Sequence, residues 1–345
     1  MKKKIREKYQ NIKIYYNRIL KNSDSYDISL FKRIKMNLRG FIGDQYVRYD
    51  FENNDIDDYI SEVERWKSRR VNGRYNIVMD DTLIFSQMFK NHINIPEIFA
   101  WIKDSKIYDL AGIYLSDKDL FNLICEEKQL VFKPAFGTGG GRGVYVVRKI
   151  KDKIFLNDKL IEEKDLLKTI KELDDYIITE FISQHEYSNN IYDKTTNTIR
   201  LITIIEPEEG TASIVGAVHR IGIEKSIPVD NASKGALVAK IDLDTGTIGE
   251  AKTYFDKTIY RIHPDSKAQI EGVKIPFWSN LKKEVLEVAQ KFPYIPFMAW
   301  DILITEDSYS VIEINASTGL DLLQIWGGER HSKLGEFYKF HNIIK

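Results

Sequence analysis

A glycine-rich segment between two apolar runs is the part of the sequence best suited to bind phosphate. Five glycines, at positions 137, 139, 140, 141 and 143, fall within VFKPAFGTGGGRGVYVV, residues 131–147. Glycines let backbone amides approach phosphate oxygens closely and adopt positive φ without strain. The segment joins two predicted strands and opens no helix, so it differs from the Rossmann and P-loop patterns. We expect a hairpin over a nucleotide, with Lys133 upstream to contact a phosphate; a flexible surface hairpin is the alternative.

Two carboxylates and one amide near the C-terminal end have the chemistry of a magnesium site. Asp301 and Glu313 fall on two strands of a predicted hairpin, and Asn315 shares a strand face with Glu313 because side chains alternate. Mg²⁺ takes such oxygen ligands and keeps water and substrate oxygens besides. Both acids are embedded in apolar sequence, so we expect them to be buried and to need a partner. Ordinary polar residues at a strand end are the alternative.

Two arginines lie within apolar strands upstream of these acids. Arg200 is in NTIRLIT and Arg220 is in VHRIG. An arginine in a half-buried strand is either paired within the protein or directed at an anion, and its guanidinium fits phosphate and carboxylate oxygens. We expect the anion-binding role; a salt bridge to Asp301 or Glu313 is the alternative. HExxH, paired CxxC and G-x-S-x-G motifs are absent from the sequence.

The composition limits the class of protein. The 345 residues suggest roughly two domains, and 51 basic against 51 acidic residues argue against a protein that coats nucleic acid or an anionic membrane. No run of 18 apolar residues occurs, so no membrane span is expected. For the basic start, MKKKIREKYQNIKIYYNRIL, a solvated helix flank is favoured over membrane contact. The single cysteine, Cys125, is expected as a small buried residue of a helix, and the protein as cytoplasmic.

The elements that must position these residues indicate an α+β fold with two lobes that meet near Ser183. Residues 1–75 are expected to form a helical N-terminal extension on the main body. Helices are expected over 82–91, 116–127, 162–173 and 281–291. Strands are expected over 130–134, 143–148, 176–182, 198–205, 212–223, 235–243, 297–304 and 310–314.

Taken in order, the lysine strand, glycine-rich hairpin, TEFI hinge strand, embedded arginine and late Asp…Glu-x-Asn resemble the ATP-grasp superfamily, from about residue 76 to 324. The stretches NTIR, VDNASKG, IDLDTG, HPD and IPFW are similar to the group called sugar-transfer-associated ATP-grasp proteins, which are linked with polysaccharide biosynthesis. The resemblance implies an ATP-grasp fold in which two α+β lobes sandwich a nucleotide. It divides the chain into the extension at 1–75, the start of the body at 76–129, the lid lobe at 130–185 and the C-terminal lobe at 186–345.

The resemblance also implies ATP and Mg²⁺ as cofactors and gives roles to individual residues. Lys133 would hold an α- or β-phosphate, and Arg200 and Arg220 would stabilise the transferring phosphoryl group as catalytic residues. Thr82 stands where many relatives have a second phosphate-binding lysine. The other implied residues are the loop Gly137, Thr138, Gly139, Gly140 and Gly141, the adenine hinge Glu180, Phe181 and Ile182, His185 and Glu186 near the ribose, Asn231 and Lys234 reaching the active site, and Asp301, Glu313 and Asn315 on the metal.

The implied reaction is ATP-dependent formation of an amide from a carboxylate and an amine through an acyl phosphate. The substrates would be small molecules or glycan precursors, such as a sugar acid or an amino acid destined for surface polysaccharide. A phosphotransferase acting on a sugar hydroxyl, with Asp230 or His219 as base, is one alternative. A nucleotide-binding module without turnover is another. No nucleic-acid partner is expected, and the sequence leaves a homo-oligomer open.

Overall fold

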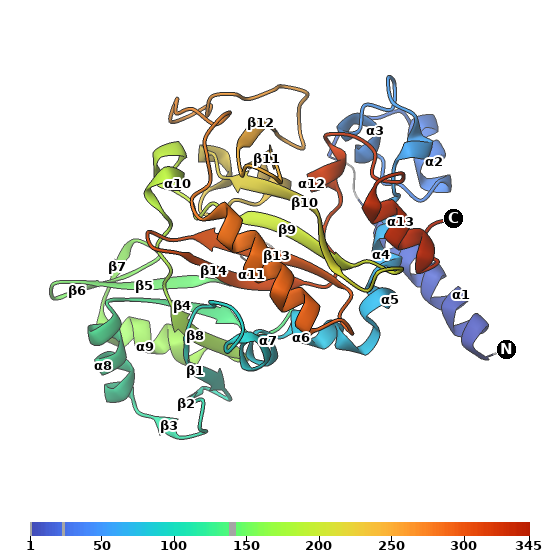
Figure 1. The fold of residues 1–345 in the computed structure, drawn as a ribbon. Coiled ribbons are helices and arrows are strands. Elements are labelled where there is room, and N and C mark those ends of the chain that lie inside the picture. Colours follow the sequence, from blue (N-terminus) through green and yellow to red (C-terminus); the bar gives the residue numbers. More distant parts are fainter. Residues whose placement is uncertain (1, 23–24, 138–142) are drawn as a thin grey trace. The chain divides into compact units, whose positions relative to one another are not determined.

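The computed structural model describes residues 2–22, 25–137 and 143–345, with side chains from residue 9 onward. These residues form two compact units, whose elements are labelled in Figure 1. Unit 1 combines Met1–Asn76, Glu186–Ile302 and Ile314–Lys345, and unit 2 combines Ile77–His185 with Leu303–Glu313. The four-part division expected from the sequence remains a prediction. None of the described helices is both long and apolar enough to cross a membrane.

Unit 1 is built on a six-stranded sheet in the order β12-β11-β10-β9-β13-β14. Strands β9 and β13 are buried along almost their whole length, as expected of central strands that are covered on both faces. The last two strands pass into unit 2 at residues 303–313. The strands are β9 (Ile199–Ile205), β10 (Ala212–Ile221), β11 (Leu237–Ile241), β12 (Ile248–Lys252), β13 (Phe297–Ile304) and β14 (Tyr309–Asn315).

Short helices from both ends of the chain pack on this sheet. Their buried residues, among them Met36, Tyr49 and Phe337, share one core cluster with Ile202 and Ala299 of the sheet. In α4, a capping box between Ser61 and Glu64 satisfies the first backbone amides. The helices of unit 1 are α1 (Lys2–Tyr15), the π-helical η1 (Tyr16–Leu20), α2 (Leu30–Leu38), α3 (Asp44–Arg48), η2 (Ile56–Asp58), α4 (Glu62–Lys67), α5 (Arg69–Asn72), η3 (Gly73–Tyr75), α10 (Glu186–Ile191), η4 (Glu224–Ser226), η5 (Ala232–Lys234), α11 (Trp278–Lys291), α12 (Asp321–Gln324) and α13 (Lys333–Phe340). Helix α6 (Asn76–Asp80) leads from unit 1 into unit 2.

Unit 2 contains an eight-stranded sheet in the order β3-β2-β1-β8-β4-β5-β6-β7. Leu120 and Ile124 of α8 and Leu166 and Ile170 of α9 pack with Phe132 and other strand residues in one core. The elements are α7 (Thr82–Phe89), β1 (Ile98–Lys103), β2 (Lys106–Asp109), β3 (Tyr114–Leu115), α8 (Asp117–Glu127), β4 (Gln129–Pro134), β5 (Tyr145–Ile150), β6 (Lys153–Leu156), β7 (Lys159–Ile161), α9 (Glu163–Lys171) and β8 (Tyr176–Glu180).

The expected elements around the candidate residues are present, with shifts of a few residues at their ends. The sequence reading missed α10, α12 and α13 and the strands β2, β3, β6, β7 and β12. Except for α13, which has eight residues, these elements have at most six residues and too few positions to show a period. The expectation for Cys125 was wrong. Its side chain is exposed, because the buried face of α8 consists of Leu120 and Ile124 and the next position turns away from the sheet.

Candidate active site

Arg200 and Asp301 form a buried ion pair at the centre of the unit 1 sheet. They lie directly opposite each other on the antiparallel strands β9 and β13, and both residues are less than 10 % exposed. Arg200 Nε donates to Asp301 Oδ1, and Nη2 donates to Oδ2 over 2.8 Å. This is the two-pronged geometry that guanidinium and carboxylate groups favour. The salt bridge that the sequence left as an alternative is therefore present.

Arg220 adds a second guanidinium group to this ion pair. Its Nη2 lies 3.2 Å from Asp301 Oδ2, so one carboxylate contacts two guanidinium groups. Arg220 Nε donates to Thr198 Oγ1 over 3.0 Å and lies 3.5 Å from Asp230 Oδ2. Asp230 in turn accepts from the Thr198 amide over 2.8 Å and from the Thr198 hydroxyl over 2.5 Å. Burial raises the pKa of Asp230, and the charge of Arg220 opposes that rise.

The strand register explains why these side chains meet. Thr198 and Arg200 are two residues apart and share a face, Arg220 pairs with Thr198 through its backbone amide, and Asp301 lies opposite Arg200. Thr318, beyond β14, completes the set, since its hydroxyl accepts from Arg200 Nη1 over 2.5 Å. We call Thr198, Arg200, Arg220, Asp230, Asp301 and Thr318 the arginine network.

A residue of the N-terminal extension also reaches this network. Arg65 of α4 donates from Nε to the Thr318 carbonyl over 2.8 Å, and its Nη1 lies 3.4 Å from Glu62 Oε1. Thr318 and Arg65 were not expected from the sequence. Thr198 could have been found, because it precedes Arg200 by two positions on the same strand face. Nothing local in the sequence connects Arg65 or Thr318 to Arg200.

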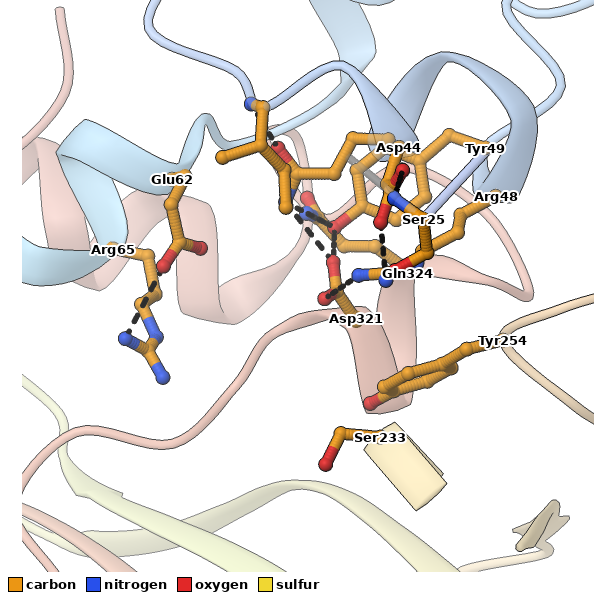
Figure 2. Close-up of polar contacts among 12 residues, drawn as sticks. Ser25, Asp44, Arg48, Tyr49, Glu62, Arg65, Ser233, Tyr254, Asp321 and Gln324 are labelled. Atoms are coloured by element: carbon orange, nitrogen blue, oxygen red, sulfur yellow. Dashed lines mark hydrogen bonds and ion pairs between the residues drawn. The ribbon is translucent and has the colours of Figure 1, made fainter. Parts of the chain in front are cut away.

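A second buried polar network ties the extension to the C-terminal segment, and Figure 2 shows its geometry. Asp321 Oδ2 accepts from Arg48 Nη1 over 3.0 Å, and Arg48 Nη2 donates to Asp44 Oδ2 over 3.1 Å. Asp321 Oδ1 accepts from Gln45 Nε2 over 3.0 Å and from the Tyr49 hydroxyl. Burial, followed by the charge of Asp321, raises the pKa of Tyr49 well above its usual value. We call Asp44, Gln45, Arg48, Tyr49, Asp321 and Gln324 the N-terminal clamp.

In unit 2, Lys133 lies on the face of β4 opposite to the one that packs on α8 and α9. Leu130 and Phe132 alternate with it and are fully buried. Burial lowers the pKa of Lys133, and the negative charge of Glu313 raises it in part. The predicted phosphate-binding lysine and one predicted metal ligand are therefore electrostatic neighbours. Glu313 itself is exposed, contrary to the expected burial: along its face of β14, Tyr309 and Val311 are buried, and the cover ends before Glu313 near the end of the strand.

The described ends of the glycine-rich loop are tied into unit 2. Gly137 donates its amide to the Asp80 carbonyl over 3.2 Å, and Thr82, at the start of α7, donates its amide to the Ala135 carbonyl over 2.8 Å. Gly143 has a φ of +73°, and a Cβ there would lie 2.7 Å from Tyr176 Oη, so a larger residue does not fit. The start of α7 thus lies beside the loop, with Thr82 in the place of the expected lysine. The predicted residues Thr138, Gly139, Gly140 and Gly141 lie outside the described residues.

The predicted adenine hinge follows the last residue of β8. Glu180 accepts the Glu97 amide on its carboxylate over 3.3 Å and donates its own amide to the Glu97 carbonyl over 2.9 Å. Phe181 and Ile182 are half-buried in the irregular segment that follows, and the guanidinium of Arg148 stands 5.4 Å from the centre of the Phe181 ring. His185 donates its amide to the Ile304 carbonyl over 2.8 Å, and Glu186 begins α10 in unit 1.

Asn231 and Lys234 follow Asp230 along the chain in unit 1. Asn231 caps η5, because its side chain accepts from the Ser233 amide over 2.9 Å and from the Ser233 hydroxyl over 2.8 Å. Lys234 is exposed at the end of the same turn. These contacts give Asn231 a structural role, and its substrate contact remains a prediction.

The predicted magnesium ligands have suitable donor atoms but different surroundings. Glu313 and Asn315 lie two positions apart near the end of β14, so their side chains share a strand face on which Glu313 is exposed and Asn315 is partly buried. Asp301 is buried and already contacts Arg200 and Arg220, so a cation would share this carboxylate with two guanidinium groups. Within the described part of the chain, no three His, Cys, Asp or Glu side chains are grouped to hold a metal. The donor chemistry fits Mg²⁺, with Glu313 and Asn315 as the accessible pair.

Known proteins resemble this chain in sequence family and in fold. An ADP complex of purK, an N5-carboxyaminoimidazole ribonucleotide synthetase, is 10 % identical, covers 70 % of this chain and 46 % of its own, and has a TM-score of 0.41. The ATP-grasp ligase PsnB complexed with minimal precursor is 13 % identical; the match covers 72 % of this chain and 54 % of that protein, with a TM-score of 0.36. The D-alanine–D-alanine ligase from Bacillus anthracis is 14 % identical; the match covers 77 % of this chain and 66 % of that protein, with a TM-score of 0.37. The chain spans about half the length of the first two structures.

No curated protein sequence matches the chain. The profile of the family described as sugar-transfer associated ATP-grasp matches residues 63–335, a span that includes Lys133, both arginines of the network and the acids of β13 and β14. The match also includes Arg65, which contacts the network from α4, so the arrangement in unit 1 lies almost entirely within the family's common region. The α+β architecture and this match together confirm the fold expected from the sequence, and the chain belongs to the sugar-transfer-associated ATP-grasp family.

Proposed function

We propose that this protein is an ATP-dependent carboxylate–amine ligase that acts through an acyl phosphate, on a sugar acid or an amino acid used in surface polysaccharide synthesis. Membership of the family and the ATP-grasp ligases among similar folds support the ligase class. The observation that carries the proposal is the pair of buried guanidinium groups on one carboxylate, Arg200 and Arg220 on Asp301. Two cations held side by side provide a site where the negative charge of a phosphoryl group is stabilised.

In the proposed reaction, a carboxylate oxygen of the substrate attacks the γ-phosphorus of ATP and ADP leaves. An amine nitrogen then attacks the acyl carbon, phosphate leaves and the amine loses a proton. Such transfers need positioning and charge neutralisation more than a protein nucleophile. Lys133 would neutralise a phosphate, and its lowered pKa reflects the burial that makes such a charge effective. Mg²⁺, held by Glu313 and Asn315 with Asp301 shared, would supply further charge neutralisation when bound.

The hydroxyl-directed phosphotransferase is less favoured by the surroundings of its two candidate bases. Asp230 already accepts two hydrogen bonds from Thr198 and lies beside Arg220. His219 is fully buried, with Nε2 at 2.8 Å from the Tyr187 hydroxyl and Nδ1 at 3.0 Å from the Arg220 carbonyl. A group in that position does not reach a substrate hydroxyl.

The test is a screen of carboxylate and amine pairs with ATP that follows ADP, followed by hydroxylamine trapping. Hydroxylamine should convert an acyl phosphate into a hydroxamate of the carboxylic substrate, which a hydroxyl kinase does not form. ATP binding without ADP release over the whole panel would instead favour the nucleotide-binding module. Phosphorylation of a sugar hydroxyl without hydroxamate would favour the kinase.

The variant Glu313→Gln tests the role of this acid in the proposed reaction. We expect turnover to fall by two orders of magnitude or more, with about the same unfolding transition as the wild type, because the side chain is exposed and isosteric. Asp307→Asn, in the turn between β13 and β14, is the control and should keep full activity, because this exposed acid lies outside the predicted site. Unchanged magnesium-dependent turnover in Glu313→Gln would remove this acid from the mechanism.

A further inference from the structure

Positive charge is concentrated in the first forty residues, although the whole chain is balanced. This stretch has twelve Lys and Arg against three Asp and Glu, whereas the chain has 51 of each. The rest of the protein is correspondingly acidic. The basic stretch comprises α1, η1 and α2, so the asymmetry belongs to one set of helices in unit 1. A local cationic surface of this kind attracts anionic partners.

Helix α2 turns its apolar stripe toward solvent. Leu30, Phe31, Ile34 and Leu38 are 69 %, 79 %, 49 % and 78 % exposed, while Met36, on the opposite side, is buried. At about 100° per residue the four exposed side chains share one face roughly 100° wide. A helix of a globular protein normally buries such a stripe. Here the single buried Met36 anchors the helix, and the larger apolar face stays uncovered within the described residues.

Basic side chains flank the stripe. Arg33 and Lys35 are exposed, and the helical period places one on each side of the four apolar residues. Of the other cations in the segment, Lys32 contacts Glu52 at 3.0 Å, and Arg39 contacts Asp57. Arg33 and Lys35 therefore lie exposed along the two edges of the apolar stripe.

A second stripe of the same type runs along α1 and η1. Tyr9, Ile12, Tyr16 and Leu20 are each more than half exposed, whereas Ile19 is buried. The two elements pack on α4. Lys13 and Lys21 are exposed within the same segment. Two neighbouring helical segments thus repeat one pattern, in which a minor face is buried and a larger apolar face is exposed among basic residues.

We propose that α2, with α1 and η1, docks the protein on an anionic lipid surface. Apolar stripes flanked by Lys and Arg bind at the headgroup level, where the apolar side chains enter the acyl boundary and the cations meet acidic lipids. With nine residues, α2 is about 14 Å long and would lie in the interface. A second copy of the chain is a poorer occupant, because a self-contact would bring two cationic surfaces together. This inference does not depend on the ligase activity.

The test is cosedimentation of the full chain with two kinds of vesicle, phosphatidylcholine alone and phosphatidylcholine with roughly one third phosphatidylglycerol. We expect at least about tenfold stronger binding to the anionic vesicles. That difference should largely disappear at about 0.5 M NaCl, where the screening length falls to roughly 4 Å. Phe31→Glu with Leu38→Glu should remove the binding, and Arg33→Gln with Lys35→Gln should weaken it about tenfold.

The matched control is Ile113→Glu with Leu160→Glu, which changes two equally exposed apolar residues of unit 2 and should bind as the wild type does. All substituted side chains are exposed, so thermal unfolding should stay unchanged. Equal binding by the stripe variant, or no preference of the wild type for anionic vesicles, would overturn the proposal. Sedimentation velocity tests whether the stripe is instead a contact between two copies of the chain. A wild-type dimer that dissociates in the variant Phe31→Glu with Leu38→Glu would show such a contact and would also overturn the proposal.

Discussion

The two largely buried charge networks of unit 1 have opposite charges at their centres. In the N-terminal clamp one guanidinium, Arg48, bridges two carboxylates, Asp44 and Asp321. In the arginine network one carboxylate, Asp301, bridges two guanidinium groups, Arg200 and Arg220. The clamp completes its shell with the neutral donors Gln45 and Tyr49, so its acids are satisfied by protein groups. The arginine network instead places two cations together on a rigid sheet.

This difference separates a structural from a functional use of the same residue types. An arrangement with excess acid repels a phosphate, whereas two adjacent guanidinium groups attract one. The clamp joins α3 to α12 across most of the sequence and thereby holds the segment that carries Thr318. We therefore expect substitutions in the clamp to reduce stability and substitutions in the arginine network to reduce turnover.

The largest effect is expected from Arg48→Met. The variant keeps the side-chain length but leaves Asp44 and Asp321 buried without their shared cation, so the free energy of unfolding should fall by about 3–5 kcal/mol. Urea unfolding measures this. Lys32→Met, which removes an exposed ion pair, is the control and should leave the free energy of unfolding nearly unchanged. A loss in Arg48→Met no larger than that of the control would mean that the clamp does not stabilise the extension.

Arg220→Gln should have the opposite effect to Arg48→Met: turnover should fall, and the free energy of unfolding should change little. Asp301 keeps Arg200, so the fold should survive, but one of the two cations for the phosphoryl group is lost. We expect ADP formation to fall about 10²–10³-fold. The exposed Arg261 serves as control, and Arg261→Gln should leave ADP formation unchanged. If Arg220→Gln lowered stability as much as Arg48→Met while keeping its turnover, the functional assignment of the arginine network would be wrong.

Acid should destabilise the sheet beneath the arginine network through His219. Burial lowers the pKa of His219 from 6.5 to about 4, so the unfolded chain binds more protons between these two pH values. The free energy of unfolding therefore has its full value above pH 6.5 and decreases by about 3 kcal/mol as the pH falls toward 4. His219→Gln should flatten this part of the pH profile in urea unfolding, while the exposed His331→Gln should not. Equal slopes for both variants would place the acid sensitivity elsewhere.

The smallest effect is expected from Thr318→Val, which removes the hydroxyl that accepts from Arg200 and keeps the shape of the side chain. The buried guanidinium loses one acceptor, so unfolding should become easier by about 1–2 kcal/mol. Turnover should fall further than stability explains, because Arg200 is then held only by Asp301. Thr211→Val, at an exposed position, is the control. A pure stability loss with unchanged kcat would restrict Thr318 to a structural role.

Local pattern predicted most of the strands and helices that carry the candidate residues, whereas the roles of those residues remain predictions. The alternation around Arg200 and Asp301 indicated buried strands, and β13 spans the residues expected for it. The capped starts of α7 and α8, at Asp81 and Ser116, are readable because capping depends on a few adjacent residues. The same reasoning identified Lys133 beside a glycine-rich loop. These features follow from backbone geometry and side-chain periodicity within about ten residues.

Partners across long sequence separations could not be read in this way. Arg48 and Asp321 lie 273 positions apart, and the contact of Arg65 with Thr318 spans 253. The exposure of Glu313 depends on where the cover of β14 ends, and the outward stripe of α2 follows from what covers the other face of the helix. The local sequence pattern indicates which side chains are charged or apolar and which segments can form helices. Their pairing and burial are set by the packing of distant segments, since the free energy of a charge or an apolar face depends on what removes it from water.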